Sequence, residues 1–306
     1  GAVALWTAQA YAHGCDVVSY FRDRAATIAQ ELMHSGLLRH DETLDIGGQE
    51  VAGLELSGRP SEDVQAPVVL LHDYESLWIQ DEQPHAAAAT YWDQLLLFYG
   101  VLRSMGIDVD IRHPEQDLSG YRLIVAPAIQ LMSARRSDAL REAARSAIFV
   151  AGPRFAYRTE TGRVHEDGQP GPLKHLLGCK LRNFDGMRPG LTVRAGGHEA
   201  VIWAECYELL GGEALVRYDD GPMQGQAAVV RHGNAVTIGA WSPSLIRETL
   251  ASLLTESGVR VMDLPDGVRI ARRGQTITWM NFNQHPAPLP DGTLMPPVSF
   301  EVRVGE

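Results

Sequence analysis

The chain contains little cysteine and no long apolar run, and each shortage excludes a class of protein. Its 306 residues include three cysteines, Cys15, Cys179 and Cys206, which are widely spaced and form no Cys-x-x-Cys pair. We therefore expect neither a disulfide framework nor a structural zinc site, but buried or inert thiols. No apolar stretch reaches the roughly 18 residues that cross a bilayer, and no signal peptide is visible, so we expect a cytoplasmic protein.

Basic residues are also few relative to acidic ones. The sequence has 27 Lys and Arg residues against 38 Asp and Glu residues, a formal net charge of −11. A nucleic-acid partner is not expected, because phosphate binding needs a concentrated positive surface. The adjacent basic pairs Arg135-Arg136 and Arg272-Arg273 are predicted to lie on the solvated surface. An acidic protein can bind neutral sugars, but this charge does not identify a ligand.

The first sixty residues have the pattern of one βα unit. Apolar spacing predicts a helix over 5–13 that ends near Gly14, and a β-branched and aromatic run predicts a strand over 17–21. Further helical turns are expected at 31–34 and near 49–56. Residues 57–63 have linker composition, so a domain boundary is expected there.

Residues 61–258 alternate between strand and helix patterns. The expected strands are 67–71, 107–111, 123–127 and 147–150, and the expected helices are 91–105, 137–145 and 243–254. This βαβαβ order predicts a mostly parallel sheet with helices on both faces, joined by right-handed crossovers. We expect an α/β, flavodoxin-like fold, close to the class I glutamine amidotransferases. A loop is expected over 72–85, and a hairpin over 227–238.

The last residues, 259–306, alternate in short pieces between Gly and Pro turns. The clearest pieces are 268–272 and 276–282. Alternation of this kind predicts a small antiparallel β domain.

Three motifs near the start resemble one family. They are the run from Trp6 to Asp16, the tetrapeptide Phe21-Arg22-Asp23-Arg24 and the tetrapeptide Glu31-Leu32-Met33-His34. They resemble the β-galactosidases of glycoside hydrolase family 42, in which Trp-x-x-Gln-Ala-x-Ala-His-Gly-Ala-Asp leads into Phe-Arg-Trp-Arg and then Glu-x-Phe-His. Asp23 and Met33 replace the Trp and the Phe of that pattern.

The resemblance continues, in the family's order, over nearly the whole chain. The further segments are Asp73-Tyr74-Glu75-Ser76-Leu77-Trp78, Asp117-Leu118-Ser119-Gly120-Tyr121 with Val125-Ala126-Pro127, Gly171-Pro172-Leu173 with Leu177-Gly178, and Tyr218-Asp219-Asp220-Gly221 with Ala227-Ala228-Val229. The resemblance implies the C-terminal half of such an enzyme. Residues 1–60 would be the remnant of the last βα unit of a (β/α)₈ barrel, 61–258 the amidotransferase-like trimerisation domain and 259–306 a small β domain.

The resemblance implies an activity for the full-length enzyme, which is the hydrolysis of terminal β-D-galactosides with retention. Glycoside hydrolysis normally needs two carboxyl groups, one as acid and one as nucleophile or base. In the family both are glutamates on barrel strands upstream of the region that this sequence resembles. We therefore expect no catalytic residue in this chain and no activity from the chain alone.

The same resemblance assigns three residues to binding. Glu31 and His34 would lie at the galactose subsite, and Trp78 would supply aromatic area to a subunit contact of a homotrimer. Residues three apart on a helical turn share one face, so a carboxylate and an imidazole could meet adjacent sugar hydroxyls. From spacing alone, an exposed pair without ligand is the alternative. A local salt bridge among Arg22, Asp23 and Arg24 with Glu31 is also expected.

Metal and nucleophilic chemistry are not expected in the middle domain. The residues His72, Asp73, Glu75, Asp81, Glu82 and His85 could offer ligands, but they lack the i, i+4 histidine spacing of a helical site, so no metal or cofactor is predicted. An independent amidotransferase-like module is the alternative function. Such a module would carry a nucleophile on a strand-to-helix turn, whereas residues 126–129 offer none.

Overall fold

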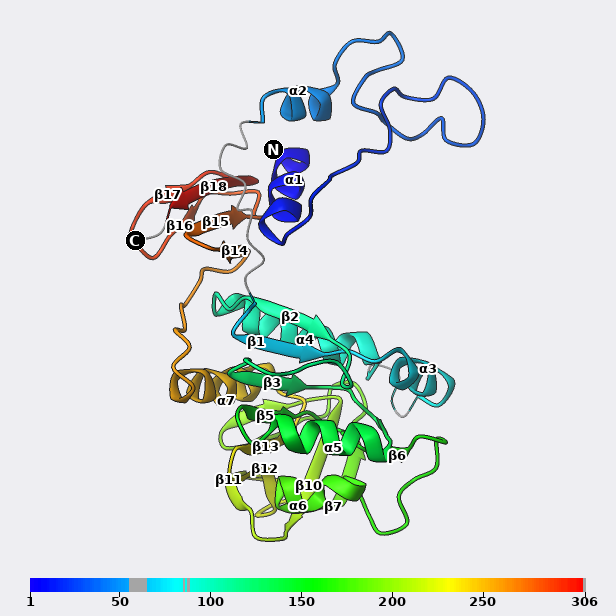
Figure 1. Cartoon of the computed structure of the whole chain (residues 1–306), viewed down its shortest axis with the longest axis vertical. Coiled ribbons are helices and arrows are strands. Elements are labelled where there is room, and N and C mark those ends of the chain that lie inside the picture. The colour runs from blue at the N-terminus through cyan, green and yellow to red at the C-terminus, as the bar shows by residue number, and fades with distance from the viewer. Residues whose placement is uncertain (55–64, 85, 87–88, 305–306) are drawn as a thin grey trace. The chain divides into compact units, whose positions relative to one another are not determined.

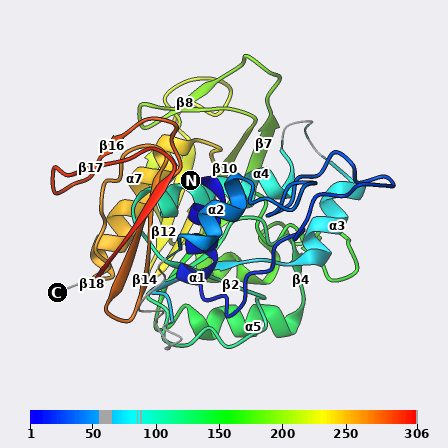
Figure 2. The same cartoon turned by 90° about the horizontal axis from the view of Figure 1, so that it is seen from above.

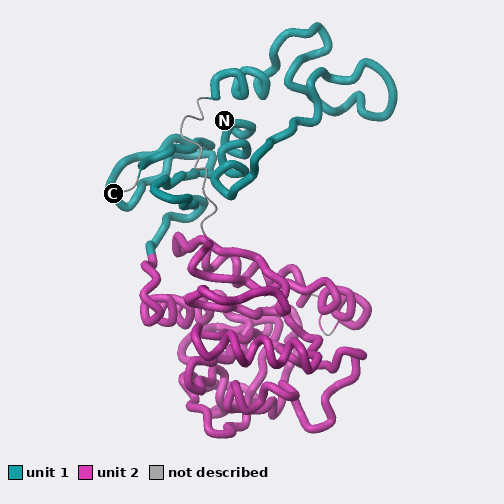
Figure 3. The backbone as a smooth tube through the Cα atoms, in the orientation of Figure 1, with its two compact units in different colours: residues 1–64, 262–306 teal, residues 65–261 magenta. Residues whose placement is uncertain are grey.

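The computed structural model describes residues 1–54, 65–84, 86 and 89–304. The chain divides into two compact units, one made of Gly1–Val64 with Met262–Glu306 and the other of Gln65–Val261 (Figure 3). None of the helices formed by the described residues is long and apolar enough to span a bilayer.

The Gln65–Val261 unit contains a nine-stranded mixed sheet. Its strands, in spatial order, are β2 (Val109–Arg112), β1 (Val68–Leu71), β3 (Leu123–Ala126), β5 (Ile148–Ala151), β13 (Ala235–Ile238), β12 (Ala227–His232), β10 (Trp203–Leu209) and β7 (Cys179–Gly186), with β11 (Glu213–Arg217) beside β12. The pairings from β2 to β13 are parallel and the remaining ones antiparallel. The predicted α/β class and the hairpin over 227–238 are confirmed.

Strands β1, β3, β5 and β13 are buried on both faces because their residues alternate between two cores, whereas the edge strand β2 is partly exposed. Val68 and Leu70 of β1 pack with α4 and α7, whereas Val69 and Leu71 pack with α5 on the opposite face (Figure 1). The helices of this unit are α3 (Tyr74–Glu82), α4 (Tyr91–Ser104), α5 (Ala134–Ala143), α6 (Lys174–Leu177) and α7 (Pro243–Glu256), with a 3₁₀ turn η1 (Gly171–Leu173). An apolar run without alternation is the sequence signal of such strands.

Helix α3 replaces the loop expected over 72–85, so that expectation was wrong. The side chain of Asp73 accepts a hydrogen bond from the backbone N–H of Ser76 and caps the helix. Thr90 and Ser133 cap α4 and α5 in the same way. The Asp-x-x-Ser spacing at residue 73 was therefore a helix-start signal.

In the other unit the first helix packs on the last strands. Helix α1 (Ala2–Ala12) lies beside these strands (Figures 1 and 2). Leu5 and Ala12 of this helix pack against Ala271 and Met280. These two residues belong to an antiparallel sheet, and its strands are β14 (Val268–Arg273), β15 (Thr276–Asn281) and β18 (Ser299–Val304). The predicted antiparallel region is confirmed. Segments more than 250 residues apart in the chain thus share one core.

The remaining pieces are short. Helix α2 covers Ile46–Ala52, and the two-stranded ribbons are β4 (Leu131–Met132) with β6 (Arg158–Thr159), β8 (Val193–Ala195) with β9 (His198–Ala200), and β16 (Ala287–Pro288) with β17 (Leu294–Met295). Residues 17–21 do not form the predicted strand, because the described residues give them no ladder partner. Residues 31–34 form a single turn closed by the hydrogen bond from His34 N to Glu31 O, 3.0 Å. The predicted linker 57–63 lies outside the described residues.

Candidate functional site

The predicted sugar-binding pair lies on an exposed turn of the first unit, together with two further residues. Arg22 Nη1 is 3.0 Å from Glu31 Oε2, and the ring of Phe21 meets His34 edge-on at 6.2 Å. Arg24 instead pairs with Glu42, so the expected local salt bridge forms with Arg22 alone. A guanidinium, a carboxylate, an imidazole and an aromatic ring therefore converge on this turn.

Phe21 and Arg22 also line a pocket of about 550 Å³ beside α1. The first unit exposes several large apolar side chains, and three of them, Trp6, Phe21 and Ile46, line this pocket. Others are Val17, Ile28 and Met33. Exposed apolar surface of this kind marks a contact with another protein segment or with a ligand.

In the second unit, the usual ligand site of an open α/β sheet is filled. Such sites lie outside the carboxyl ends of the strands where the strand order reverses, which here is between β1 and β3. Ser76 Oγ accepts the backbone N–H of Gln130, 3.0 Å, and the Gln130 amide donates to Gln80 Oε1, 2.7 Å. Gln94 donates to the carbonyl oxygens of Pro127 and Pro153. Buried amide side chains therefore occupy the crevice.

In this unit, the turn with left-handed backbone angles follows the parallel strand β5. It does not follow the parallel strand β3. Arg154 has φ 64° there, and its backbone N–H donates to Glu205 Oε1, 2.9 Å. Residues 126–129, which offer no nucleophile, lie at the end of the neighbouring strand β3. The residue at the strained position carries a guanidinium, which cannot attack a carbonyl.

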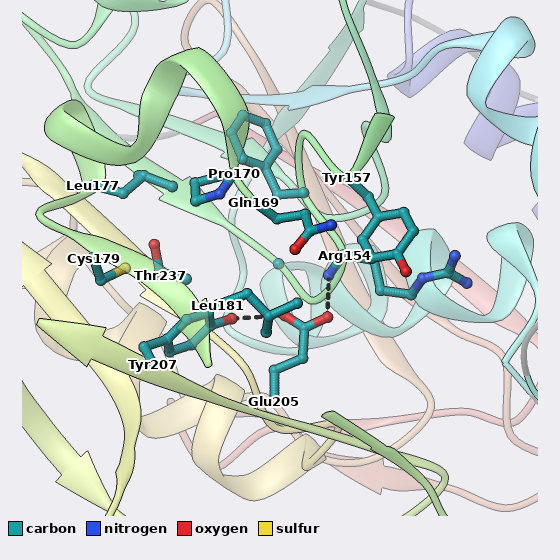
Figure 4. A pocket seen from close by; sticks show the side chains of 12 residues that line it. Arg154, Tyr157, Gln169, Pro170, Leu177, Cys179, Leu181, Glu205, Tyr207 and Thr237 are labelled. Atoms are coloured by element: carbon teal, nitrogen blue, oxygen red, sulfur yellow. Dashed lines mark hydrogen bonds between the residues drawn. The ribbon is translucent and has the colours of Figure 1, made fainter. Parts of the chain in front are cut away.

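Glu205 is buried at the same place and is fully hydrogen-bonded (Figure 4). Besides Arg154 N, it accepts hydrogen bonds from Trp203 Nε1, 3.0 Å, and Tyr207 Oη, 2.8 Å. The Arg154 guanidinium lies 5.1 Å from the ring centres of both Tyr157 and Trp203. Burial raises the pKa of Glu205 and lowers the pKa of Arg154 to about 10.

The cavity beside Glu205 is small. Its volume is about 10 Å³ (Figure 4), which is room for one water molecule and not for a substrate. Cys179 lines it, and burial raises the pKa of that thiol to about 12. A thiol with such a pKa is not a nucleophile near neutral pH.

Arg136 joins α3, α5 and the end of β2 in a buried charge network. Its guanidinium donates to both carboxylate oxygens of Asp73, at 2.9 and 3.2 Å, and also to Glu75 and Glu115. Burial alone would raise the pKa of Asp73, but hydrogen bonds from Ser76 and the charge of Arg136 outweigh it and hold that pKa below its usual range.

The prediction that Arg135 and Arg136 both lie on the solvated surface was wrong for Arg136 and correct for Arg135. The Arg136 side chain is 7% exposed, whereas that of Arg135 is 79% exposed. The buried Leu140 lies four positions after Arg136 on α5, so the helix period places both on the core-facing side.

The same network contains a group of potential metal ligands. Ligand atoms of Asp73, Glu75 and His113 lie within 4.8 Å of one another, the single such group among the described residues. Arg136 contacts all three and supplies the balancing positive charge, so we assign no metal to them. Asp81 and Glu82 are not part of the group, and His85 lies outside the described residues.

Above this network, α3 and α4 expose aromatic rings. Trp78 is 61% exposed, and its ring stacks on Tyr74 at 6.1 Å. His72 lies between the helices, 4.6 Å from Tyr74 and 5.3 Å from Trp92. Large exposed aromatic patches of this kind are typical of protein contacts.

Comparison with protein-family models decides the family. A model described as the β-galactosidase trimerisation domain matches residues 66–260, and one described as β-galactosidase matches residues 1–57. The chain belongs to glycoside hydrolase family 42. The family resemblance of the opening motifs is thereby confirmed.

Individual β-galactosidases match most of this chain. One from Thermus thermophilus is 38% identical in an alignment of 294 residues that covers 92% of this chain and 44% of that enzyme. The solved β-galactosidase of Halorubrum lacusprofundi matches with a TM-score of 0.92 at 33% identity, over 100% of this chain and 50% of that one. The enzyme of Marinomonas ef1 gives a TM-score of 0.88 at 27% identity, over 99% and 49%. The chain thus spans about half the length of these family 42 relatives.

Two residues that organise the second unit were missed by sequence reasoning. Glu205 had only a partial signal, because its donors Trp203 and Tyr207 lie two positions on either side of it on β10, whereas the third donor, Arg154, is 51 positions away. For Arg136 the sequence did hold a signal, which is its helical spacing to Leu140.

Proposed function

We propose that this chain is the assembly half of a family 42 β-galactosidase, an enzyme that hydrolyses terminal β-D-galactosides with retention. The chain itself would supply self-association and part of the galactose subsite. The observation that carries the proposal is the match of residues 66–260 to a trimerisation domain. The relatives that cover nearly the whole chain are named β-galactosidases, which supports the substrate class.

For assembly we propose a homotrimer in which the partner is a second copy of this chain. Three identical copies close into a ring through heterologous contacts, so each copy offers two different surfaces. Trp78 is our candidate contact residue, because its ring is largely exposed on the matched unit.

For fold and boundaries we propose a flavodoxin-like, amidotransferase-like domain at 61–258, between a barrel remnant at 1–60 and a β domain at 259–306. The strand order β2-β1-β3-β5-β13 supports the label, because it is the flavodoxin order. The buried amide side chains at the carboxyl ends of the strands weigh against an independent amidotransferase-like binding module, since they already hydrogen-bond to one another and to backbone carbonyl oxygens.

Trp78→Ala should weaken self-association. Central tryptophans of protein interfaces contribute about 2 kcal/mol or more, so the trimer dissociation constant should rise about 30-fold or more. Sedimentation equilibrium over a wide concentration range measures this change. Glu31→Ala is the control and should leave the constant unchanged, because Glu31 is assigned to the sugar. An unchanged constant for Trp78→Ala would remove that residue from the contact.

For the sugar site, we expect Glu31→Ala to lower kcat/KM of a full-length family 42 enzyme that carries this chain. A hydrogen bond to a charged group contributes about 1.5–3 kcal/mol, so the expected loss is roughly 10- to 100-fold. Glu142→Ala, an exposed glutamate on α5, serves as the control. The chain by itself should not hydrolyse a chromogenic galactoside above background, because the two family glutamates are not in it. Activity that survives repeated purification would contradict this assignment.

A further inference from the structure

The described part of the second unit carries two exposed surfaces of opposite charge. The first, which we call the acidic-aromatic surface, consists of Tyr74, Trp78, Asp81, Glu82, Trp92 and Leu96 on α3 and α4. Tyr74, Trp78, Asp81 and Glu82 follow the i, i+4, i+7 and i+8 spacing of one helix face. Two aromatic rings and two carboxylates therefore lie next to one another along one face of α3.

The second surface, which we call the basic strip, begins on the edge strand β7 and continues through the following loop to β8. It consists of Arg182, Phe184, Arg188, Leu191 and Arg194, all exposed. Strand β7, which carries the first two, pairs with β10 on one side and ends the sheet on the other. An edge strand with an exposed aromatic ring is a natural place for another chain to bind.

The described residues of the unit give the charges of both surfaces no ion-pair partner. Over residues 65–84 and 89–261, the structure gives no ion pair to the side chains of Asp81 and Glu82. The same holds there for Arg182, Arg188 and Arg194. By contrast, Glu75 next to the first surface is bound by Arg136. Two complementary surfaces, each apolar at its centre, are what a heterologous ring contact requires.

We propose that the acidic-aromatic surface of one copy contacts the basic strip of the next copy in the trimer. The inference rests on the proposed self-association and adds which two surfaces meet. Arginine side chains of the strip would lie over the Trp78 and Trp92 rings, as cation–π pairs do, and would meet the carboxylates of Asp81 and Glu82. Contact between these surfaces also explains why large rings remain exposed on α3 and α4.

Charge reversal and its rescue test the pairing by light scattering and sedimentation equilibrium. Asp81→Arg with Glu82→Arg should raise the trimer dissociation constant about 100-fold or more, because like charges then face each other. Arg182→Glu with Arg188→Glu should have a similar effect. All four changes in one chain should restore the constant to within about tenfold. Asp138→Arg with Glu142→Arg, two exposed acids on α5, is the matched control and should change it less than about threefold.

The outcomes separate the two proposals. Trimers that tolerate both reversals, or a quadruple variant that associates no better than either pair, would overturn the pairing and leave self-association standing. An unmodified chain that stays monomeric at every concentration would overturn both. Circular dichroism of every variant must match the parent, which excludes unfolding as the cause of dissociation.

Discussion

Arg136→Ala should lower the free energy of unfolding of the second unit by about 3–5 kcal/mol, since removal of one partner from a buried ion pair leaves the other charge uncompensated. Asp73 is the group left behind, because it is 1% exposed and both of its oxygens accept from Arg136. Urea unfolding at one fixed protein concentration measures the loss, and fixing the concentration removes the effect of assembly.

The adjacent arginine provides the control for this prediction. Arg135→Ala removes an exposed ion pair to Glu115 and should cost less than about 1 kcal/mol. Equal losses for both variants would contradict the buried network.

The loss should also depend on pH. The folded-state pKa of Asp73 lies below its usual range, so its ion pair stabilises the fold fully above the unfolded-state pKa of about 3.9. That contribution is lost as the pH falls through the folded-state pKa. Parent and variant should therefore differ most near neutral pH and converge in strong acid. A difference that stays constant down to pH values of about 2 would contradict the assignment to Asp73.

Glu205→Ala should cost a similar amount, about 3–5 kcal/mol, for a related reason. The substitution leaves the donors of Trp203, Tyr207 and Arg154 without their acceptor in a buried site, and each buried unsatisfied donor costs about 1–3 kcal/mol. It also removes the nearest negative charge from the buried guanidinium. Urea unfolding followed by circular dichroism measures the loss.

Glu208→Ala is the matched control on the same strand. Glu208 is exposed and pairs with Lys180 at 3.2 Å, so its loss should change stability by no more than about 0.5 kcal/mol. A Glu205→Ala variant as stable as Glu208→Ala would show that the three donors find other partners.

Much of the second unit was predictable because local signals and burial agree there. Val68 to Leu71 is apolar at every position, and the structure buries all four in a parallel strand. Thr90 stands before an apolar helix pattern and caps α4. Where the local signal was polar, as at Tyr74–Glu82, the helix was missed, because exposed side chains on one face hide the helical period.

For the candidate sugar-binding turn, the sequence predicted which residues group together but not the backbone conformation. The family motif predicted the grouping of Glu31 with His34, and the expected Arg22–Glu31 pair forms. The strand predicted at 17–21 does not form, since a strand requires a hydrogen-bonded neighbour that spacing along the chain cannot supply.

By itself, the sequence determined the family and the α/β class with its mostly parallel central strands. Only the tertiary structure decided that α1 packs on β14 and β15, that Arg136 is buried beside an exposed Arg135, and that Glu205 holds the turn at Arg154. The physical reason is the distance along the chain over which each kind of interaction acts. Capping, periodicity and turn chemistry act within a few residues and are written in the sequence, whereas burial of a charge depends on partners more than fifty positions away.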